Sequence, residues 1–116
     1  RWVLSDRFID SSLAYQGGAG ALGLEAVRAI NAFGIGPWFP DRTLVLIHPE
    51  GAERARARDG EDSDRIGGRP AAYHEAVEAA FRTIAADEPE RVRLIDASGA
   101  VEVVTRRLLD ALADLP

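Results

Sequence analysis

The chain alternates short apolar runs with longer segments in which apolar residues recur every three or four positions. Residues 2–4 and 43–47 form apolar runs, and residues 92–95 form a third short, mainly apolar segment; such runs are typical of strands buried on both faces of a sheet. Strands that alternate with helices favour a parallel sheet with right-handed crossovers. We therefore predict an α/β fold with three parallel strands and flanking helices.

Three longer segments have helical periodicity, and in each we expect one apolar stripe to face the core. The stripe residues are, in 22–33, Leu22, Ala26, Ile30 and Phe33; in 73–84, Tyr73, Val77, Ala80, Phe81 and Ile84; and in 101–115, Val101, Val104, Leu108, Leu112 and Leu115. A shorter helix is predicted to begin at the N-cap residue types in positions 10–12. The glycines at 17, 18 and 20 predict its end after about two turns.

The composition narrows the possible functions. The 116 residues include 14 basic and 19 acidic side chains, and the formal net charge of −5 excludes a generic basic nucleic-acid binder. All basic residues are arginines, and the chain has no lysine, cysteine or methionine. Thiol nucleophiles, thiolate metal sites and Schiff-base catalysis are therefore excluded within this sequence. No apolar run approaches the roughly 20 residues of a membrane span, so we expect no membrane partner.

The placement of arginines gives the clearest indication of chemistry. Arg7 follows the first apolar run, at a predicted strand end where open α/β sheets bind ligands. Arg54, Arg56 and Arg58 lie along a predicted helix. That helix leads into residues 59–70, a charged, glycine-containing segment with two more arginines that we expect to be mobile. Guanidinium groups suit bidentate phosphate contacts, although a solvated helix face and loop would carry the same residues. His48 and His74 lack metal-ligand spacing, and we interpret them as structural.

Four ordered motifs resemble the thymidylate kinase family. Residues 5–8 and 10–17 are similar to its Asp-Arg-aromatic strand end and to the Ser-x-x-Ala-Tyr-Gln helix after it. Residues 40–44 match its Pro-Asp-x-Thr-Leu strand entry, residues 54–58 with Asp64 and Arg65 look like its LID, and residues 95–98 resemble its last strand and turn. Separated matches in the right order are more specific than any one of them alone.

The resemblance implies transfer of the γ-phosphoryl group of ATP to dTMP, giving dTDP for dTTP synthesis, with Mg2+ as cofactor. Arg7 would bind the dTMP phosphate, and Asp6 would position the water shell of the Mg2+ ion. The residues expected around the deoxyribose and thymine are Ser11, Ser12, Tyr15 and Gln16, with Tyr15 disfavouring a 2′-hydroxyl. The structural alternatives are N-capping by the serines and burial of Tyr15 in the core.

On the ATP side, the resemblance implies that Arg56, Arg58 and Arg65 of the LID face the phosphates and stabilise the transition-state charge. Ala97 and Ser98 match the turn near the adenine, where backbone contacts would act. The chain would then be a single domain fragment, with an acceptor-site half at 1–40, a LID-bearing segment at 54–70 and a C-terminal strand and helix at 91–116.

The family's first strand and its phosphate loop, Gly-x-x-x-x-Gly-Lys-Ser/Thr, have no counterpart in this sequence. We therefore expect a partial P-loop nucleotide-kinase fold without its central strand, inactive by itself and part of a longer thymidylate kinase. The alternatives are a non-catalytic α/β domain that binds a nucleotide or a partner, and a kinase with another base preference. The family also implies a cytoplasmic location and, at full length, a homodimer whose interface the helix at 22–33 is apolar enough to join.

Overall fold

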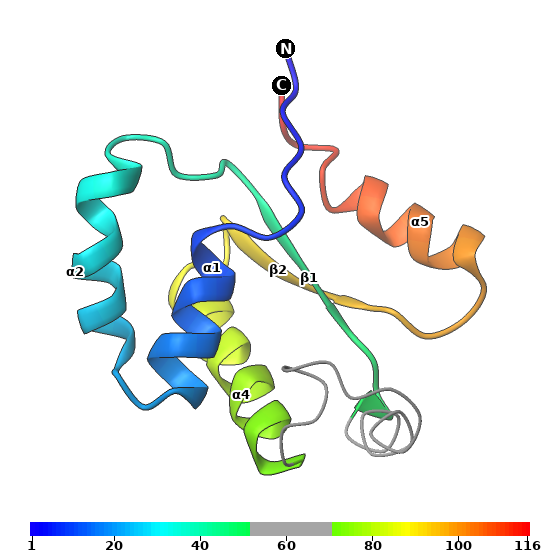
Figure 1. Cartoon of the computed structure of the whole chain (residues 1–116). Coiled ribbons are helices and arrows are strands. Elements are labelled where there is room, and N and C mark those ends of the chain that lie inside the picture. Colours follow the sequence, from blue (N-terminus) through cyan, green and yellow to red (C-terminus); the bar gives the residue numbers. More distant parts are fainter. Residues whose placement is uncertain (52–70) are drawn as a thin grey trace.

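The structure is a computed structural model that describes residues 1–51 and 71–116. Its elements, in chain order, are α1 (Ile9–Ser12), the π-helix η1 (Leu13–Ala19), α2 (Leu24–Ile35), β1 (Thr43–Ile47), α4 (Ala71–Asp87), β2 (Val92–Asp96) and α5 (Val101–Asp110). Figure 1 shows how these elements are arranged. Helices on a parallel pair of strands confirm the α/β class.

β1 and β2 form a two-stranded parallel sheet, and both lie where the apolar runs predict them. Their register runs from Thr43 opposite Val92 to Ile47 opposite Asp96. Because the strands run in the same direction, their carboxyl ends share one edge of the sheet, and their amino ends share the other. Polar residues that follow the two strands can therefore contact one another at the carboxyl edge, and polar residues that precede them can do so at the amino edge.

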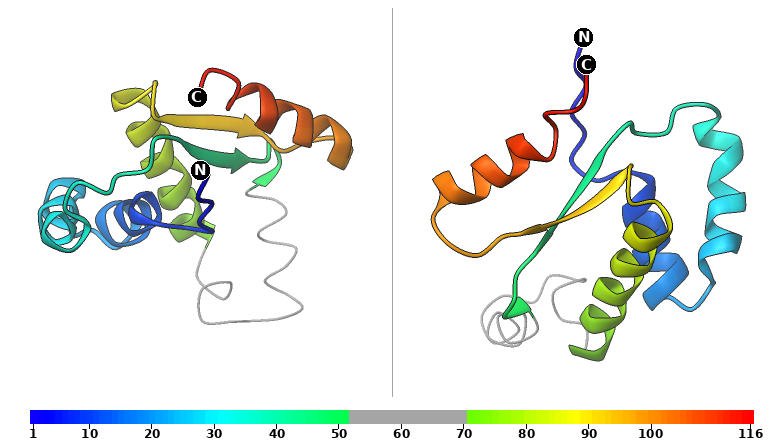
Figure 2. Two further views of the ribbon diagram at one scale, coloured as in Figure 1. Left: turned by 90° about the horizontal axis from the view of Figure 1, so that it is seen from above. Right: turned by 180° about the vertical axis from the view of Figure 1, so that it is seen from behind.

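α4 forms the centre of the core, because it packs against both β2 and η1. In Figure 2, α1 and α2 lie on the same side of the strands as α4, and α5 lies on the other side. The predicted stripe of α4 faces inward, and Ile84 within it is only 1% exposed. The other buried residues of this core are Ile9, Leu13, Ala14, Val27, Val45, Val77, Ala80, Ala85 and Val92.

The first predicted strand, residues 2–4, does not form. Trp2, Val3 and Leu4 are exposed by 64%, 89% and 99%, and no strand is assigned to them. An extended segment becomes a strand only where another strand accepts and donates its backbone hydrogen bonds, and neither β1 nor β2 does so here. The described residues thus form two strands rather than the three predicted.

The first helix continues through two of the glycines that were predicted to end it. Its second half, η1, has the wider winding of a π-helix, and the Gly20 N–H donates to the Tyr15 carbonyl at 2.8 Å. Gly18 lies so close to α4 that a Cβ atom there would come within 2.4 Å of the Ala80 Cβ. The glycine allows two helices to approach closely, which offsets its low helix propensity.

The helix predicted at 22–33 is α2, but it presents a different face to the core. Val27 is 3% exposed, and Leu24 and Ile35 pack against the core. The predicted inward residues are instead exposed, by 61%, 73% and 98% for Leu22, Ile30 and Phe33. Because α2 carries apolar residues on more than one face, periodicity alone does not determine which face is buried.

α5 lies against β2, and the chain after it returns to the start of β1. Val104 and Leu108 of its predicted stripe are half-buried, whereas Val101 is 77% exposed. Arg42 holds the returning segment through bonds of 2.9 and 3.1 Å to the two Asp114 carboxylate oxygens. In the described part of the chain, no helix is both long and apolar enough to span a membrane.

Candidate functional site

Arg7 and Tyr15 meet at the start of the first helix. The Arg7 guanidinium carbon lies 5.2 Å from the centre of the Tyr15 ring, and Arg7 Nη2 donates to the Tyr15 hydroxyl at 3.5 Å. The Arg7 backbone has a φ of 63°, in the left-handed region that residues other than glycine rarely adopt. The Ser5 hydroxyl donates to the Arg7 carbonyl at 3.1 Å. Such strained positions cluster at functional sites, so Arg7 is the strongest candidate for binding a ligand.

Arg7 is also a cation without a carboxylate partner among the described ion pairs. A guanidinium over an aromatic face, with its remaining N–H groups free, can donate two parallel hydrogen bonds to a phosphate. The structure therefore brings together two of the predicted acceptor residues, Arg7 and Tyr15, in a geometry suited to an anionic group.

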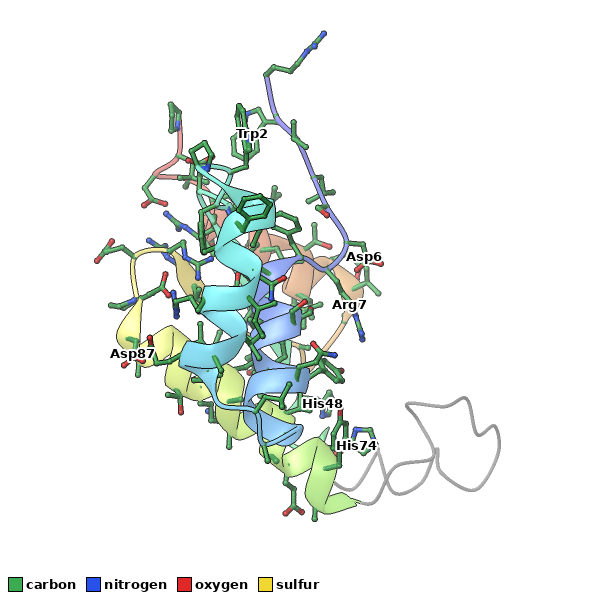
Figure 3. All side chains as sticks on the ribbon, turned by 60° about the vertical axis from the view of Figure 1, so that its left-hand side comes forward. Trp2, Asp6, Arg7, His48, His74 and Asp87 are labelled. Carbon is green, nitrogen blue, oxygen red and sulfur yellow. The ribbon has the colours of Figure 1, made fainter. Side chains whose placement is uncertain are left out.

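Tyr15 projects from η1 toward α4. Its ring centre is 6.2 Å from that of Tyr73, and Tyr73 in turn meets His74 edge to face at 5.9 Å. A cavity of about 230 Å³ lies beside them, between η1, the end of β1 and α4. Its lining includes both histidines, and Figure 3 shows His48 and His74 near one another. Gln16, the next residue after Tyr15, is exposed.

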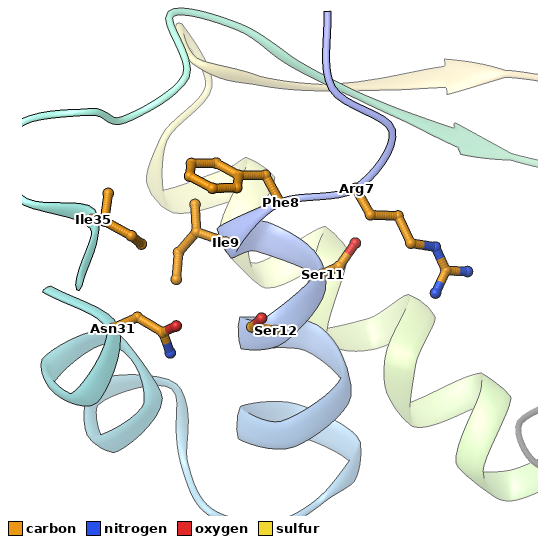
Figure 4. A pocket seen from close by; sticks show the side chains of 7 residues that line it. All are labelled: Arg7, Phe8, Ile9, Ser11, Ser12, Asn31 and Ile35. Atoms are coloured by element: carbon orange, nitrogen blue, oxygen red, sulfur yellow. The ribbon is translucent and has the colours of Figure 1, made fainter.

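Ser12 lies on another face of the same helix. A second cavity, of about 340 Å³, opens between α1 and α2, and Figure 4 shows Ser12 and Asn31 on facing sides of it. Arg7 contributes to its rim, but its guanidinium points away from Phe8 and Ile35 at the apolar end. Ser11 and Ser12 are half-buried, and neither makes a side-chain cap bond at the start of its helix. The predicted acceptor residues therefore lie on two faces of one helix.

Asp6 precedes Arg7 and is exposed, as Figure 3 shows. Mg2+ in proteins keeps several waters and takes one or two carboxylates, with substrate phosphates completing its shell. No cluster of three or more His, Asp or Glu side chains that could hold a metal occurs in the described ranges. A single exposed carboxylate fits contact with Mg2+ through water, and does not fit a metal site built from protein ligands alone.

The turn after β2 is held by its own side chains. The Asp96 carboxylate accepts from the Ser98 hydroxyl at 2.6 Å and from the Ser98 N–H at 2.8 Å. The Ser98 hydroxyl bond is the main reason that the pKa of Asp96 is lowered, and Arg107 adds to the shift. Arg107 Nη1 donates to the carbonyls of Asp96 and Ser98, both at 2.8 Å. The backbone at Ala97 and Ser98 is therefore fixed at the carboxyl edge of the sheet, where such sheets bind ligands.

Three predicted residues, Arg56, Arg58 and Arg65, lie outside the described residues, as does the whole LID-bearing segment at 54–70. Their predicted role on the ATP phosphates stays a prediction.

Sequence reasoning missed one polar cluster. Asp10 has the residue type of an N-cap, yet it is 3% exposed and its carboxylate binds Arg91, which is 81 positions away. No local pattern relates two residues so far apart. The sequence offered one indication of this pair, because Arg91 is a charged residue directly before β2.

The sequence model of the thymidylate kinase family matches residues 1–108. The chain belongs to the thymidylate kinase family. The family inferred from the four motifs is thereby confirmed.

Curated relatives in bacteria agree. The chain is 50% identical to a thymidylate kinase of Rhizorhabdus wittichii over 117 aligned residues, which cover 99% of the chain and 56% of that protein. It is 42% identical to one of Bradyrhizobium diazoefficiens, covering 97% and 51%, and 44% identical to one of Symbiobacterium thermophilum, covering 93% and 51%. The chain thus spans about half the length of the thymidylate kinases it matches.

Proposed function

We propose that the protein containing this chain phosphorylates dTMP to dTDP with ATP as the phosphoryl donor. Membership of the thymidylate kinase family supports the class of reaction. The observation that carries the proposal within this chain is the strained Arg7, held over the Tyr15 ring without a carboxylate partner in the described residues. That arrangement suits a nucleotide phosphate better than it suits a structural role.

The acceptor side follows from this arrangement. Arg7 donates hydrogen bonds to the dTMP phosphate and holds it for in-line attack. Tyr15 supports the guanidinium and covers one side of the sugar, and Gln16 and Ser11 are placed on the same helix for contacts to the nucleotide. Ser12, on the face toward α2, contributes less than the other predicted acceptor residues because it is directed at Asn31.

In the transfer itself, an oxygen of the dTMP phosphate attacks the γ-phosphorus of ATP. The bond from that phosphorus to the β–γ bridging oxygen breaks, and ADP leaves with the electron pair. Mg2+, when bound, neutralises charge on the phosphates, and Asp6 orders water around it. Ala97 and Ser98 offer a fixed backbone to the adenine, and Arg56, Arg58 and Arg65 supply positive charge at the phosphates.

The whole protein is the unit of activity in this proposal. The chain has no lysine, so it contains no phosphate-loop lysine for the β and γ phosphates. Ile30 and Phe33 on the exposed apolar face of α2, with Leu22 just before the helix, form the surface that we propose for the homodimer. Cytoplasmic location stays a prediction.

The test is steady-state phosphorylation by the protein as its gene encodes it, with dTMP, dUMP, dCMP and dGMP as acceptors. We expect kcat/KM to be highest for dTMP and to fall in Arg7→Ala. A higher kcat/KM for another acceptor would support a nucleotide kinase, but one with a substrate other than dTMP. Absence of any transfer, with dTMP still raising the melting temperature, would favour a nucleotide-binding domain without catalysis.

A further inference from the structure

Among the described residues, Asp10 is the one acidic residue that is buried. It directly precedes Ser11. Both of its carboxylate oxygens are used. Arg91 Nη2 donates to Oδ1 at 2.7 Å, Arg91 Nη1 donates to Oδ2 at 2.8 Å, and the Thr43 hydroxyl donates to Oδ2 at 2.6 Å. The pair is therefore bidentate, which fixes the orientation of both groups as well as their distance.

Arg91 is held from its other side as well. Its Nε donates to Glu88 at 2.5 Å, and its guanidinium lies 5.4 Å from the centre of the Phe39 ring. Glu88 also accepts from Arg28 of α2 at 3.0 Å. Hydrogen bonding to Asp10 is the main cause that raises the pKa of Arg91. We call Asp10, Thr43, Glu88 and Arg91 the Asp10–Arg91 cluster.

The cluster joins α1 to the sheet at a defined point. Thr43 is the first residue of β1, and Arg91 directly precedes β2, so both lie at the amino edge of the sheet. α1 otherwise packs chiefly against its own continuation, η1. The ion pair is thus the main specific polar contact between the start of the first helix and the strands.

The candidate acceptor residues surround this attachment point along the chain. Arg7 lies three positions before Asp10, Ser11 follows it directly, and Tyr15 lies five positions after it on one continuous helix. A shift or rotation of the helix about Asp10 would move all three. Burying an ion pair adds little stability compared with apolar packing, but in some proteins such a pair selects one geometry among several.

We propose that the Asp10–Arg91 ion pair sets the position of Arg7, Ser11 and Tyr15 relative to the sheet, so that Asp10 is a positioning residue for the acceptor nucleotide. The inference rests on the proposed function.

Asp10→Asn in the whole protein tests it, because the change keeps the side-chain shape and removes the charge. We expect KM for dTMP to rise by about tenfold, since small misplacements of binding groups are costly. KM for ATP should stay within about twofold, because Ala97 and Ser98, the donor residues that the structure describes, lie at the other edge of the sheet.

Asp114→Asn is the matched control. It also breaks a bidentate pair with an arginine, Arg42, but at the tail after α5. Both variants should lower the melting temperature, and only Asp10→Asn should change KM for dTMP. A cluster that merely stabilises the fold would give the two variants the same kinetic profile.

Thr43 offers a second pair of variants in case Asp10→Asn does not fold. Thr43→Val keeps the shape and removes the hydroxyl that donates to Asp10, whereas Thr43→Ser keeps the hydroxyl. We expect KM for dTMP to rise about two- to fivefold in Thr43→Val and to stay near wild type in Thr43→Ser.

Three results would overturn the proposal: unchanged KM for dTMP in folded Asp10→Asn and Thr43→Val, an equal rise for dTMP and ATP, or the same shift in Asp114→Asn. Each would leave the proposed function standing if the wild-type protein phosphorylates dTMP. A wild-type protein that does not phosphorylate dTMP would overturn the proposed function, and this inference with it.

Discussion

The sheet with α4 and the segment from residue 1 to α2 differ in how regular they are. β1, β2 and α4 have ordinary geometry, and α4 buries the apolar stripe that its sequence predicts. The N-terminal segment contains a left-handed arginine, a π-helix and a helix that exposes its expected inner face. The candidate acceptor residues all lie in this second region. The comparison teaches that the regular region was the easier one to predict, whereas the N-terminal segment combines buried residues of the shared core with the residues that we propose for binding.

The largest expected effect on stability comes from the centre of the regular region. Ile84→Ala removes a side chain that is 1% exposed, and we expect the free energy of unfolding to fall by about 2–5 kcal/mol. KM for dTMP, measured well below the melting temperature, should not change. A change in KM without loss of stability would break the comparison.

Gly18 tests the boundary between the two regions. A Cβ atom at this position would lie 2.4 Å from the Ala80 Cβ, so Gly18→Ala should force η1 and α4 apart and cost about 1–3 kcal/mol. Gly34→Ala in α2 is the control, because a Cβ there meets nothing within 4 Å. That control should be neutral or stabilising, by up to about 1 kcal/mol, because alanine favours helix. Thermal unfolding of both variants measures the difference, and equal losses would contradict the close packing.

The smallest effect is the pH dependence contributed by Glu88. Hydrogen bonding from Arg91, reinforced by Arg28, lowers the pKa of Glu88 from its ordinary value of 4.5. A lowered pKa in the folded state stabilises the fold above pH 4.5, and this contribution is lost as the pH falls through the folded-state value. Glu88→Gln should therefore flatten the decline in unfolding free energy in acid. An unchanged acid slope would mean that Glu88 binds protons equally in the folded and unfolded states.

The sequence predicts the structure of the sheet and α4 better than it predicts the structure of the N-terminal segment. The mainly apolar segments at 43–47 and 92–95 predict their strands, because a short apolar segment between helical segments is typical of a buried strand. The strand predicted at 2–4 does not form, because strand pairing depends on a partner strand that the local sequence does not specify. The prediction for α2 is wrong about which face is buried, because the helix carries apolar residues on two faces.

For the site, Arg7 and Tyr15 could be predicted from motif resemblance, and the structure places them in contact. That Ser12 faces α2 could not be predicted, because it depends on where α2 packs. Asp10 was predicted from its residue type to cap a helix, and its pairing with Arg91 depends on the register of β1 and β2. Long-range geometry is set by the fold as a whole, and a local pattern does not record it.

The most direct test of the central claim is calorimetric titration of the whole protein with dTMP and with thymidine, for wild type and Arg7→Ala. Because we propose that Arg7 binds the phosphate, we expect the variant to lose about 10- to 100-fold in affinity for dTMP and to bind thymidine as the wild type does. Equal losses for the two ligands, or no loss for dTMP, would contradict the assignment of Arg7 to the acceptor phosphate.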